Sequence, residues 1–311
     1  MNAHVTGLHH ITAIASDPRQ NLDFYTRALG LRFVKKSVNQ DDPGTYHLYY
    51  GDYNASPGTI FTFFPWAGMR RGRPGTGQAY ATAFSVPAGA LPFWQERFRK
   101  LNVPQQAIEQ RFSDEVLPFA DPDGLRLELV ATREADARVA APATDVPAAV
   151  AIRGFHSSTL AVTDATATAQ VLTGSMGYKI SAQSEHRTRY AAGPGGPGTY
   201  VDLLADPTLP RGLNGAGTIH HVAFRVADDA AEVAARNVLL KDGLQVSPVI
   251  DRAYFKSIYY REPAGVLFEI ATDGPGFAID EPLEQLGTKL GLPPHLEVHR
   301  AEIEAALPKI D

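Results

Sequence analysis

The chain has 311 residues, of which 44% are hydrophobic and 20% charged, a balance typical of a globular protein whose length favours two domains. A net charge of −5 argues against nucleic-acid binding, no apolar run approaches the roughly 18 residues of a membrane-spanning helix, and no secretory signal pattern is present, so we expect a cytoplasmic protein. Because the chain has no cysteine, disulfides, thiolate ligands, iron–sulfur clusters and a cysteine nucleophile are excluded, and any bound metal must use nitrogen and oxygen ligands.

Four segments of the chain share one order of predicted elements: an alternating strand, an amphipathic helix, further strands, and a closing strand after a glycine. The opening strands are predicted at 8–15, 79–86, 155–162 and 219–226. The helices are predicted near 21–29, 91–101, 165–174 and 229–241. The closing strands are predicted at 58–64, 124–130, 198–204 and 265–271. We therefore predict an α+β fold built from four βαβββ modules.

The segment between the second and third modules is rich in alanine and proline and poor in large apolar residues, which is typical of a linker. The predicted divisions are an N-terminal domain at 1–132, a linker at 133–152, a C-terminal domain at 153–273 and a tail at 274–311. The end of the tail, from Pro294, is predicted to be helical, and we favour a surface helix over a functional lid.

Equivalent positions in the four modules hold different side chains. Alignment of the opening strands places at one position His10, Ala81, Ser157 and His221. Alignment of the closing strands places at another Thr62, Glu128, Asp202 and Glu269. If two modules pair into a cup, only modules one and four bring together two histidines and a carboxylate, with Thr62 in the fourth place. His10, His221 and Glu269 then form the set found in non-heme Fe(II) oxygenases, which leaves coordination positions open for substrate and O2.

Two further observations support this set. Glu269 lies in an otherwise apolar strand, where a carboxylate is costly to bury unless it is paired or bound to a metal, and we favour the metal. Of the 10 histidines, only 9–10 and 220–221 form adjacent pairs, and both pairs open a module. Glu128 has no histidines at its matching positions, so for this residue we predict a salt bridge or hydrogen bond.

The stretches GLHHITAIASDPRQNLDFYTRALGL, TIHHVAFRV and GVLFEIATD resemble the vicinal oxygen chelate superfamily, whose βαβββ modules pair into metal-holding cups. More narrowly, almost the whole chain is similar to ring-cleaving dioxygenases that act on hydroquinones, through stretches such as YHLYYGD, PGTIFTFFPW and RAYFKSIYYREPAGVLFE. The resemblance implies two domains with cupped mixed sheets and the same ligands, His10, His221 and Glu269. It also implies further site residues at His9, Thr12, His220, Arg252 and Tyr259.

The resemblance implies Fe(II) as the metal, with Mn(II) or another divalent ion as alternatives, because nitrogen and oxygen ligands accept these ions too. The expected activity is that of an extradiol-type dioxygenase that inserts both atoms of O2 into a hydroquinone or catechol-like aromatic. His220 is a candidate acid or base, although it points away from His221 in an ideal strand, so a bulge or twist is required. Tyr259 is a candidate hydrogen-bond donor to the reacting oxygen, and Arg252 a partner for a second hydroxyl or acidic substituent.

Two other classes of function remain open. One is a glyoxalase-type isomerase or metal-dependent thiol transferase, and the other is a non-catalytic protein that binds aromatic compounds or drugs. An isomerase benefits from a carboxylate at the fourth cup position, which Thr62 does not supply, and a binding protein needs no metal set. The expected partners are a small aromatic substrate and O2, with no nucleic acid and no membrane, and the chain is compatible with a homo-oligomer.

Overall fold

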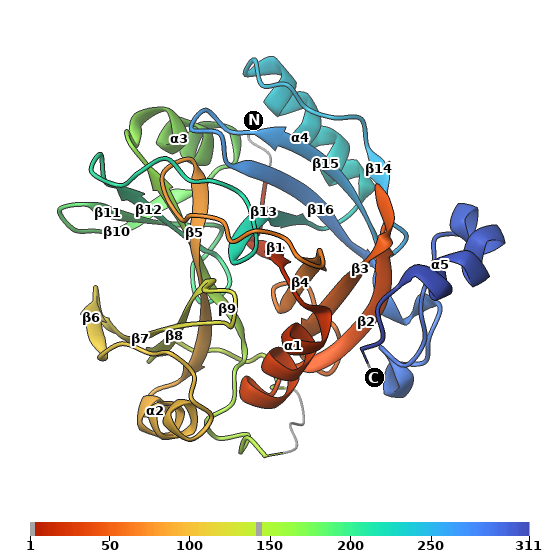
Figure 1. Cartoon of the computed structure of the whole chain (residues 1–311). Coiled ribbons are helices and arrows are strands. Elements are labelled where there is room, and N and C mark those ends of the chain that lie inside the picture. Colours follow the sequence, from red (N-terminus) through yellow and green to blue (C-terminus); the bar gives the residue numbers. More distant parts are fainter. Residues whose placement is uncertain (1–3, 141–144, 311) are drawn as a thin grey trace.

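The computed structural model describes residues 4–140 and 145–310 and contains two curled, mixed sheets of eight strands each (Figure 1). Residues 1–3, 141–144 and 311, which belong to the predicted N-terminal domain, linker and tail, lie outside the described residues. The predicted α+β class with cupped mixed sheets is confirmed.

The first sheet joins the first and last modules of the chain. Its strand order is β14-β15-β16-β13-β1-β4-β3-β2, with β1 and β13 paired antiparallel at its centre. The bounds are β1 Leu8–Ala15, β2 Arg32–Asn39, β3 Asp42–Gly51, β4 Ile60–Pro65, β13 Thr218–Val226, β14 Ile250–Asp251, β15 Phe255–Arg261 and β16 Leu267–Pro275. The pairing of modules one and four, which the metal-site prediction required, is therefore confirmed.

The second sheet joins the two middle modules in the order β10-β11-β12-β9-β5-β8-β7-β6, with β5 and β9 antiparallel at its centre. The bounds are β5 Gln78–Pro87, β6 Glu109–Arg111, β7 Asp114–Ala120, β8 Arg126–Thr132, β9 Gly154–Val162, β10 Lys179–Gln183, β11 Arg187–Ala191 and β12 Tyr200–Ala205. Each sheet thus draws strands from both halves of the chain, while the domain limits at 132 and 153 stay a prediction.

Each module carries its predicted helix. The bounds are α1 Pro18–Asp23 with the π-helical η1 Phe24–Ala28, α2 Leu91–Lys100, α3 Thr166–Gln170 with the π-helical η2 Val171–Ser175, and α4 Asp229–Lys241. The Asp228 carboxylate caps α4 by accepting a hydrogen bond from the Ala231 amide, and the buried Ala235 and Leu239 lie on the face of α4 that is turned inward. Among the described residues, no helix is long and apolar enough to span a membrane.

Aromatic side chains join the two sheets. The ring of Phe61 on β4 lies 5.7 Å from that of Phe84 on β5 and 6.0 Å from that of Phe155 on β9, measured between centroids. All three are fully buried, and burial of such a side chain stabilises a fold by about 1.5–3 kcal/mol. This core fixes the sheets against each other and leaves their cupped faces free for other residues.

The tail lies against the edge strand of the first sheet. Its elements are η3 Phe277–Ile279, η4 Leu283–Gln285, η5 Pro294–His299 and α5 Arg300–Ala306, so the predicted helical end is confirmed. On β2, the buried Lys35 ammonium pairs with Asp280 at 2.6 Å and also with Glu281. Next to it, the Ser37 hydroxyl donates a hydrogen bond of 2.8 Å to the Gly291 carbonyl.

Candidate metal centre

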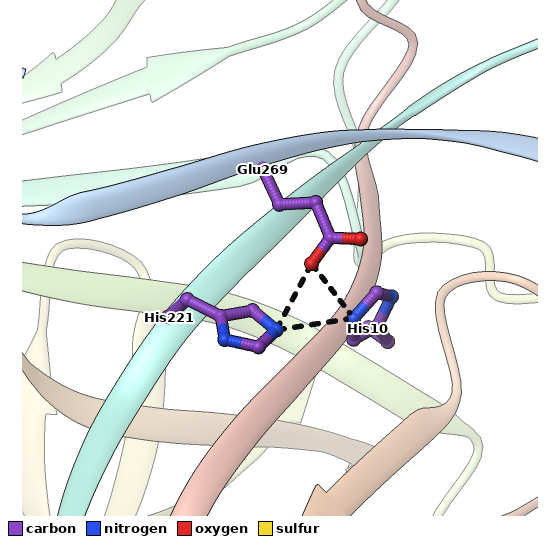
Figure 2. A group of neighbouring side chains, drawn as sticks. All are labelled: His10, His221 and Glu269. Atoms are coloured by element: carbon purple, nitrogen blue, oxygen red, sulfur yellow. Dashed lines mark hydrogen bonds and ion pairs between the residues drawn. The ribbon is translucent and has the colours of Figure 1, made fainter. Parts of the chain in front are cut away.

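Three buried side chains converge in the cup of the first sheet, which we call the metal cup: His10 on β1, His221 on β13 and Glu269 on β16 (Figure 2). The Glu269 Oε2 atom lies 2.9 Å from Nε2 of His221 and 3.2 Å from Nε2 of His10, and the two nitrogens are 3.3 Å apart. Among the described residues, these three are the one group of this kind whose candidate ligand atoms all lie within 4.8 Å of one another. The predicted meeting of the three side chains is therefore observed.

The electrostatics of the carboxylate suit a cation. Burial alone raises the pKa of Glu269, but the two imidazoles of His10 and His221 hold it well below its ordinary value. Burial also lowers the pKa of His221, which favours the neutral imidazole that can ligate a metal. A buried anion facing two neutral nitrogens is stable when an ion sits between them, and this donor set fits a divalent transition metal.

Two β-bulges shape the histidine doublets. The β1–β13 ladder slips by one residue at His9 and again at His220. An extra residue in a ladder redirects its side chain, so both members of each doublet can approach one another. The Nδ1 atoms of His9 and His10 lie 2.9 Å apart, and those of His220 and His221 lie 2.8 Å apart. The bulge that the role of His220 required is thus present.

The first doublet has a defined arrangement of protons. His9 Nε2 lies 3.0 Å from the carbonyl oxygen of Thr272, which can only accept, so Nε2 of His9 donates. Burial lowers the pKa of His9 to about 3, which keeps the ring neutral and makes its Nδ1 an acceptor. The Nδ1–H of His10 then donates to His9, and the lone pair of His10 Nε2 faces Glu269, as a metal ligand requires.

The metal cup opens on a cavity of about 420 Å³, a size suited to a small ligand. Its wall includes the aromatic side chains of Tyr49, Phe64, Trp66, Tyr254, Phe255 and Tyr259. His220 also lines this cavity, and its ring packs edge-on against Phe64 with a centroid distance of 5.7 Å. Burial lowers the pKa of His220 to about 3.

Tyr259 and Arg252 both line the cavity, while their roles stay a prediction. Tyr259 lies opposite Glu269 in the β15–β16 ladder, and its hydroxyl is 3.2 Å from Arg252 Nε and 3.1 Å from the Ser257 hydroxyl. Burial and the charge of Glu269 raise the pKa of Tyr259, so the phenol stays protonated and can donate a hydrogen bond. Arg252 is further held by Gln40, whose Oε1 accepts from Nη1 at 3.3 Å.

A chain of hydrogen bonds fills the fourth place of the metal cup. The hydroxyls of Thr12 and Thr62 lie 2.7 Å apart, His47 Nε2 lies 2.9 Å from the Thr62 hydroxyl, and the Tyr49 hydroxyl lies 2.7 Å from His47 Nδ1. Thr12 thus stands at the site as predicted, whereas His47 was not among the predicted residues. The alternation of YHLYYGD puts His47 and Tyr49 on one face of β3, which is the signal that points to them.

The matching carboxylate of the second sheet behaves differently. Glu128 accepts two hydrogen bonds from Arg111, of 2.6 Å from Nη1 and 2.9 Å from Nη2. The prediction of a salt bridge for Glu128 is therefore confirmed.

Comparison with known proteins places this geometry in context. Residues 7–129 and 154–270 match the family model described as the Glyoxalase/Bleomycin resistance protein/Dioxygenase superfamily. The structure also resembles a crystal structure of a provisionally named dioxygenase from Bacillus subtilis subsp. subtilis str. 168, with a TM-score of 0.94, 45% identity, and coverage of 99% of this chain and 98% of that one. Glyoxalase I from Zea mays shares the fold, with a TM-score of 0.65 at 13% identity over 86% of this chain and 92% of that one.

Two curated relatives carry the names of dioxygenases. The chain is 47% identical over 301 residues to a Bacillus subtilis (strain 168) protein provisionally named ring-cleaving dioxygenase MhqO, covering 97% of this chain and 95% of that protein. It is 35% identical over 309 residues to the chlorohydroquinone/hydroquinone 1,2-dioxygenase of Sphingobium indicum (strain DSM 16413), covering 96% of this chain and 95% of that enzyme.

Proposed function

Because the chain belongs to the Glyoxalase/Bleomycin resistance protein/Dioxygenase superfamily, as its sequence resemblance predicted, we propose that it is an extradiol-type ring-cleaving dioxygenase. The proposed metal is Fe(II), held by His10, His221 and Glu269, and the proposed substrate is a hydroquinone or catechol-like aromatic that receives both atoms of O2. The names of the relatives support ring cleavage as the reaction class. The observation that carries the proposal is the convergence of two imidazole nitrogens and one buried carboxylate at an aromatic-lined cavity.

When held by His10, His221 and Glu269, Fe(II) would supply the Lewis acidity that eases loss of the phenolic proton and the redox chemistry that O2 requires. The chain's own contribution begins with exclusion of water. Phe64, Trp66 and Phe255 line the cavity with apolar surface against which an aromatic ring packs. In that environment each hydrogen bond to the reacting oxygens is stronger than it is in water.

Tyr259 supplies such a hydrogen bond. Its protonated hydroxyl donates to the substrate oxygen beside Glu269, and the Arg252 guanidinium holds the phenol ring in place and adds positive charge where negative charge develops. Arg252 also offers its remaining N–H groups to a second hydroxyl or an acidic substituent of the ring.

His220 donates a hydrogen bond rather than taking up a proton. If His221 binds the metal through Nε2, its Nδ1–H donates to Nδ1 of His220 across 2.8 Å. A neutral His220 then carries its own proton on Nε2, and this N–H is available to a substrate or product oxygen in the cavity. The role follows from the bulge at His220, which turns the ring toward His221.

The isomerase alternative lacks its base. The fourth place of the metal cup holds Thr62, whose hydroxyl is engaged with Thr12 and His47, and no carboxylate stands there. A threonine hydroxyl does not abstract a proton near neutral pH, so a glyoxalase-type reaction is disfavoured.

Oxygen uptake tests the proposal. Protein purified without air and loaded with Fe(II) is given hydroquinone, catechol or a methylglyoxal–thiol adduct. We expect one O2 consumed per aromatic ring opened and no turnover of the adduct. Tyr259→Phe is expected to lower kcat by about 10- to 100-fold at unchanged iron content, because it removes one donor to the reacting oxygen. Iron-loaded protein that consumes no O2 with either aromatic would contradict the proposal and favour a binding protein.

A further inference from the structure

The second sheet forms a cup of its own, which strand pairing relates to the metal cup. Glu128 faces the central strand β5 across a parallel pair, as Glu269 faces the central strand β13. Asp202 faces β9 in the same way that Thr62 faces β1. The closing-strand positions of this second cup therefore carry two carboxylates, where the metal cup has one.

The opening strands of the second cup have lost the metal-binding nitrogens. The β5–β9 ladder slips at Tyr80 and at His156, just as the β1–β13 ladder slips at the first histidine of each doublet. The residues that follow these bulges are Ala81 and Ser157, in place of the second histidines. The second cup thus keeps the backbone of a metal site without its imidazole ligands.

Guanidinium groups neutralise the carboxylates instead. Arg111 binds Glu128 through two hydrogen bonds of 2.6 and 2.9 Å. Arg189 binds Asp202 through two of 2.8 and 3.1 Å, and Arg187 Nη1 lies 3.3 Å from the same carboxylate. Guanidinium–carboxylate pairs with two hydrogen bonds are geometrically specific. In the second cup, arginine side chains therefore compensate the negative charge of the carboxylates, whereas in the metal cup a cation would do so.

This cup opens on a cavity of about 470 Å³. The charged groups of its lining are Arg111, Arg126, Arg187, Glu109 and Glu128. Arg111 pairs with both carboxylates of the lining, and Arg187 shares Asp202, which lies behind the lining, with Arg189. Arg126 forms no ion pair with any described residue and lies over the Tyr80 ring at 4.4 Å from its centroid.

Arg187 has unused donors. Its Nη1 atom donates to the Thr159 hydroxyl at 2.9 Å and to Asp202, while within the described chain no acceptor lies at hydrogen-bond distance from its Nε or Nη2. Burial and the nearby charge of Arg111 lower the pKa of Arg187, in keeping with a positive local potential. An anion in the cavity would relieve this repulsion and satisfy the free N–H groups.

We propose that the second cup binds a small organic monocarboxylate through Arg126 and Arg187. A guanidinium fork matches the two oxygens of a carboxylate. Because Arg126 is the lining guanidinium without a carboxylate partner among the described residues, a monoanion suits the site better than a dianion such as phosphate. The apolar part of the ligand packs on Phe119 and Leu127, which line the same cavity. This site is separate from the proposed reaction at the metal cup.

Benzoate and its neutral analogue benzamide test the proposal by titration calorimetry on the full chain. We expect saturable benzoate binding with a Kd of about 1 mM or lower and at least tenfold weaker binding of benzamide. Arg126→Gln changes an exposed residue and is expected to weaken benzoate binding about tenfold, while Ala81→Leu fills the cavity and abolishes it. Thermal melts verify that both variants fold.

The metal cup offers Arg252 as a competing anchor for benzoate, so Arg252→Gln is the matched control and is expected to bind benzoate like the unmodified chain. Equal binding of benzamide and benzoate, no saturable binding, or retention of binding in both Arg126→Gln and Ala81→Leu would overturn the proposal. Loss of binding in Arg252→Gln alone would assign the anion to the metal cup and overturn it equally.

Discussion

The Nε2 atom of His9 donates a hydrogen bond of 3.0 Å to the carbonyl oxygen of Thr272, three residues beyond the carboxylate of the proposed metal set. This contact joins β1 to β16 and, through the neutral ring of His9, sets the position of the proton on His10. The side chain that precedes a proposed ligand would therefore influence a bound metal through the tautomer of that ligand.

His9→Phe is expected to lower the affinity for a divalent metal by about 10- to 100-fold while the chain stays folded, because the Nδ1–H of His10 loses its acceptor. Phenylalanine keeps the packing of this ring against Phe255, whose centroid lies 5.1 Å away. Calorimetric titration of apoprotein with Mn(II) measures the effect. His9→Gln, which keeps an acceptor oxygen, is expected to recover part of the metal affinity. Unchanged metal affinity in His9→Phe would show that His9 does not influence metal binding.

Thr62→Val is expected to lower the free energy of unfolding by about 1–3 kcal/mol, because the buried hydroxyl of Thr12 and the imidazole of His47 lose their shared partner. Metal content should not change, since the proposed set does not include Thr62. Urea denaturation and metal analysis of the same preparation measure both quantities. A variant with full stability and little metal would show instead that Thr62 is a ligand.

Much of this architecture was predictable from local patterns. The spacing of strand and helix signals predicted the four modules, and comparison of equivalent positions predicted that the first and last modules pair. The doublet 220–221 indicated a bulge or twist, because adjacent side chains of an ideal strand point to opposite faces, and the ladder has a bulge at His220. These features repeat along the chain, and that repetition made them visible.

Contacts between segments that are far apart in the sequence occur only once in the chain, so no repeated pattern in the sequence predicts them. Lys35 stands in the strand RFVKKS without a sign that its partner lies 245 positions away at Asp280. His47 lines the cavity from the face of β3 that it shares with Tyr49, but nothing local to this strand indicates that this face meets the cup formed by His10 and His221. The change from α- to π-helix at Phe24 likewise has no local signal that we identify.

Lys35→Met is expected to lower the free energy of unfolding by about 3 kcal/mol, because Glu281 is left as a buried carboxylate without its cation. The tail from Asp280 onward should also become more sensitive to limited proteolysis, which mass spectrometry of the fragments detects. Lys289→Met, at an exposed position of the same tail, serves as the control and should behave like the unmodified chain. Equal protection of the tail in both variants would show that Lys35 does not hold it.

Glu232 makes stability depend on pH. Both carboxylate oxygens lie on the buried side of α4 without a hydrogen-bond partner among the described residues, and burial, then the charge of Asp229, raises the pKa of Glu232 to about 7. A raised pKa means that the folded state keeps a proton that the unfolded chain has lost, so stability present at pH 4.5 declines as pH rises toward 7.

Glu232→Gln should therefore gain about 1–3 kcal/mol in free energy of unfolding over the unmodified chain at pH 8, and little at pH 4.5. Denaturation curves at both pH values measure the difference. Glu302→Gln on the exposed face of α5 is the control, with no comparable pH dependence. A constant difference between Glu232→Gln and the unmodified chain across this range would show that the carboxyl does not titrate as described.

Metal analysis of three proteins purified without air and equilibrated with Fe(II) tests the central claim most directly. The unmodified chain and Glu128→Gln are expected to hold about one metal per chain, because Glu128 is paired with Arg111. Glu269→Gln is expected to hold less than about a tenth of that while remaining folded by circular dichroism. Full metal occupancy in Glu269→Gln, or loss of metal in Glu128→Gln instead, would contradict the account.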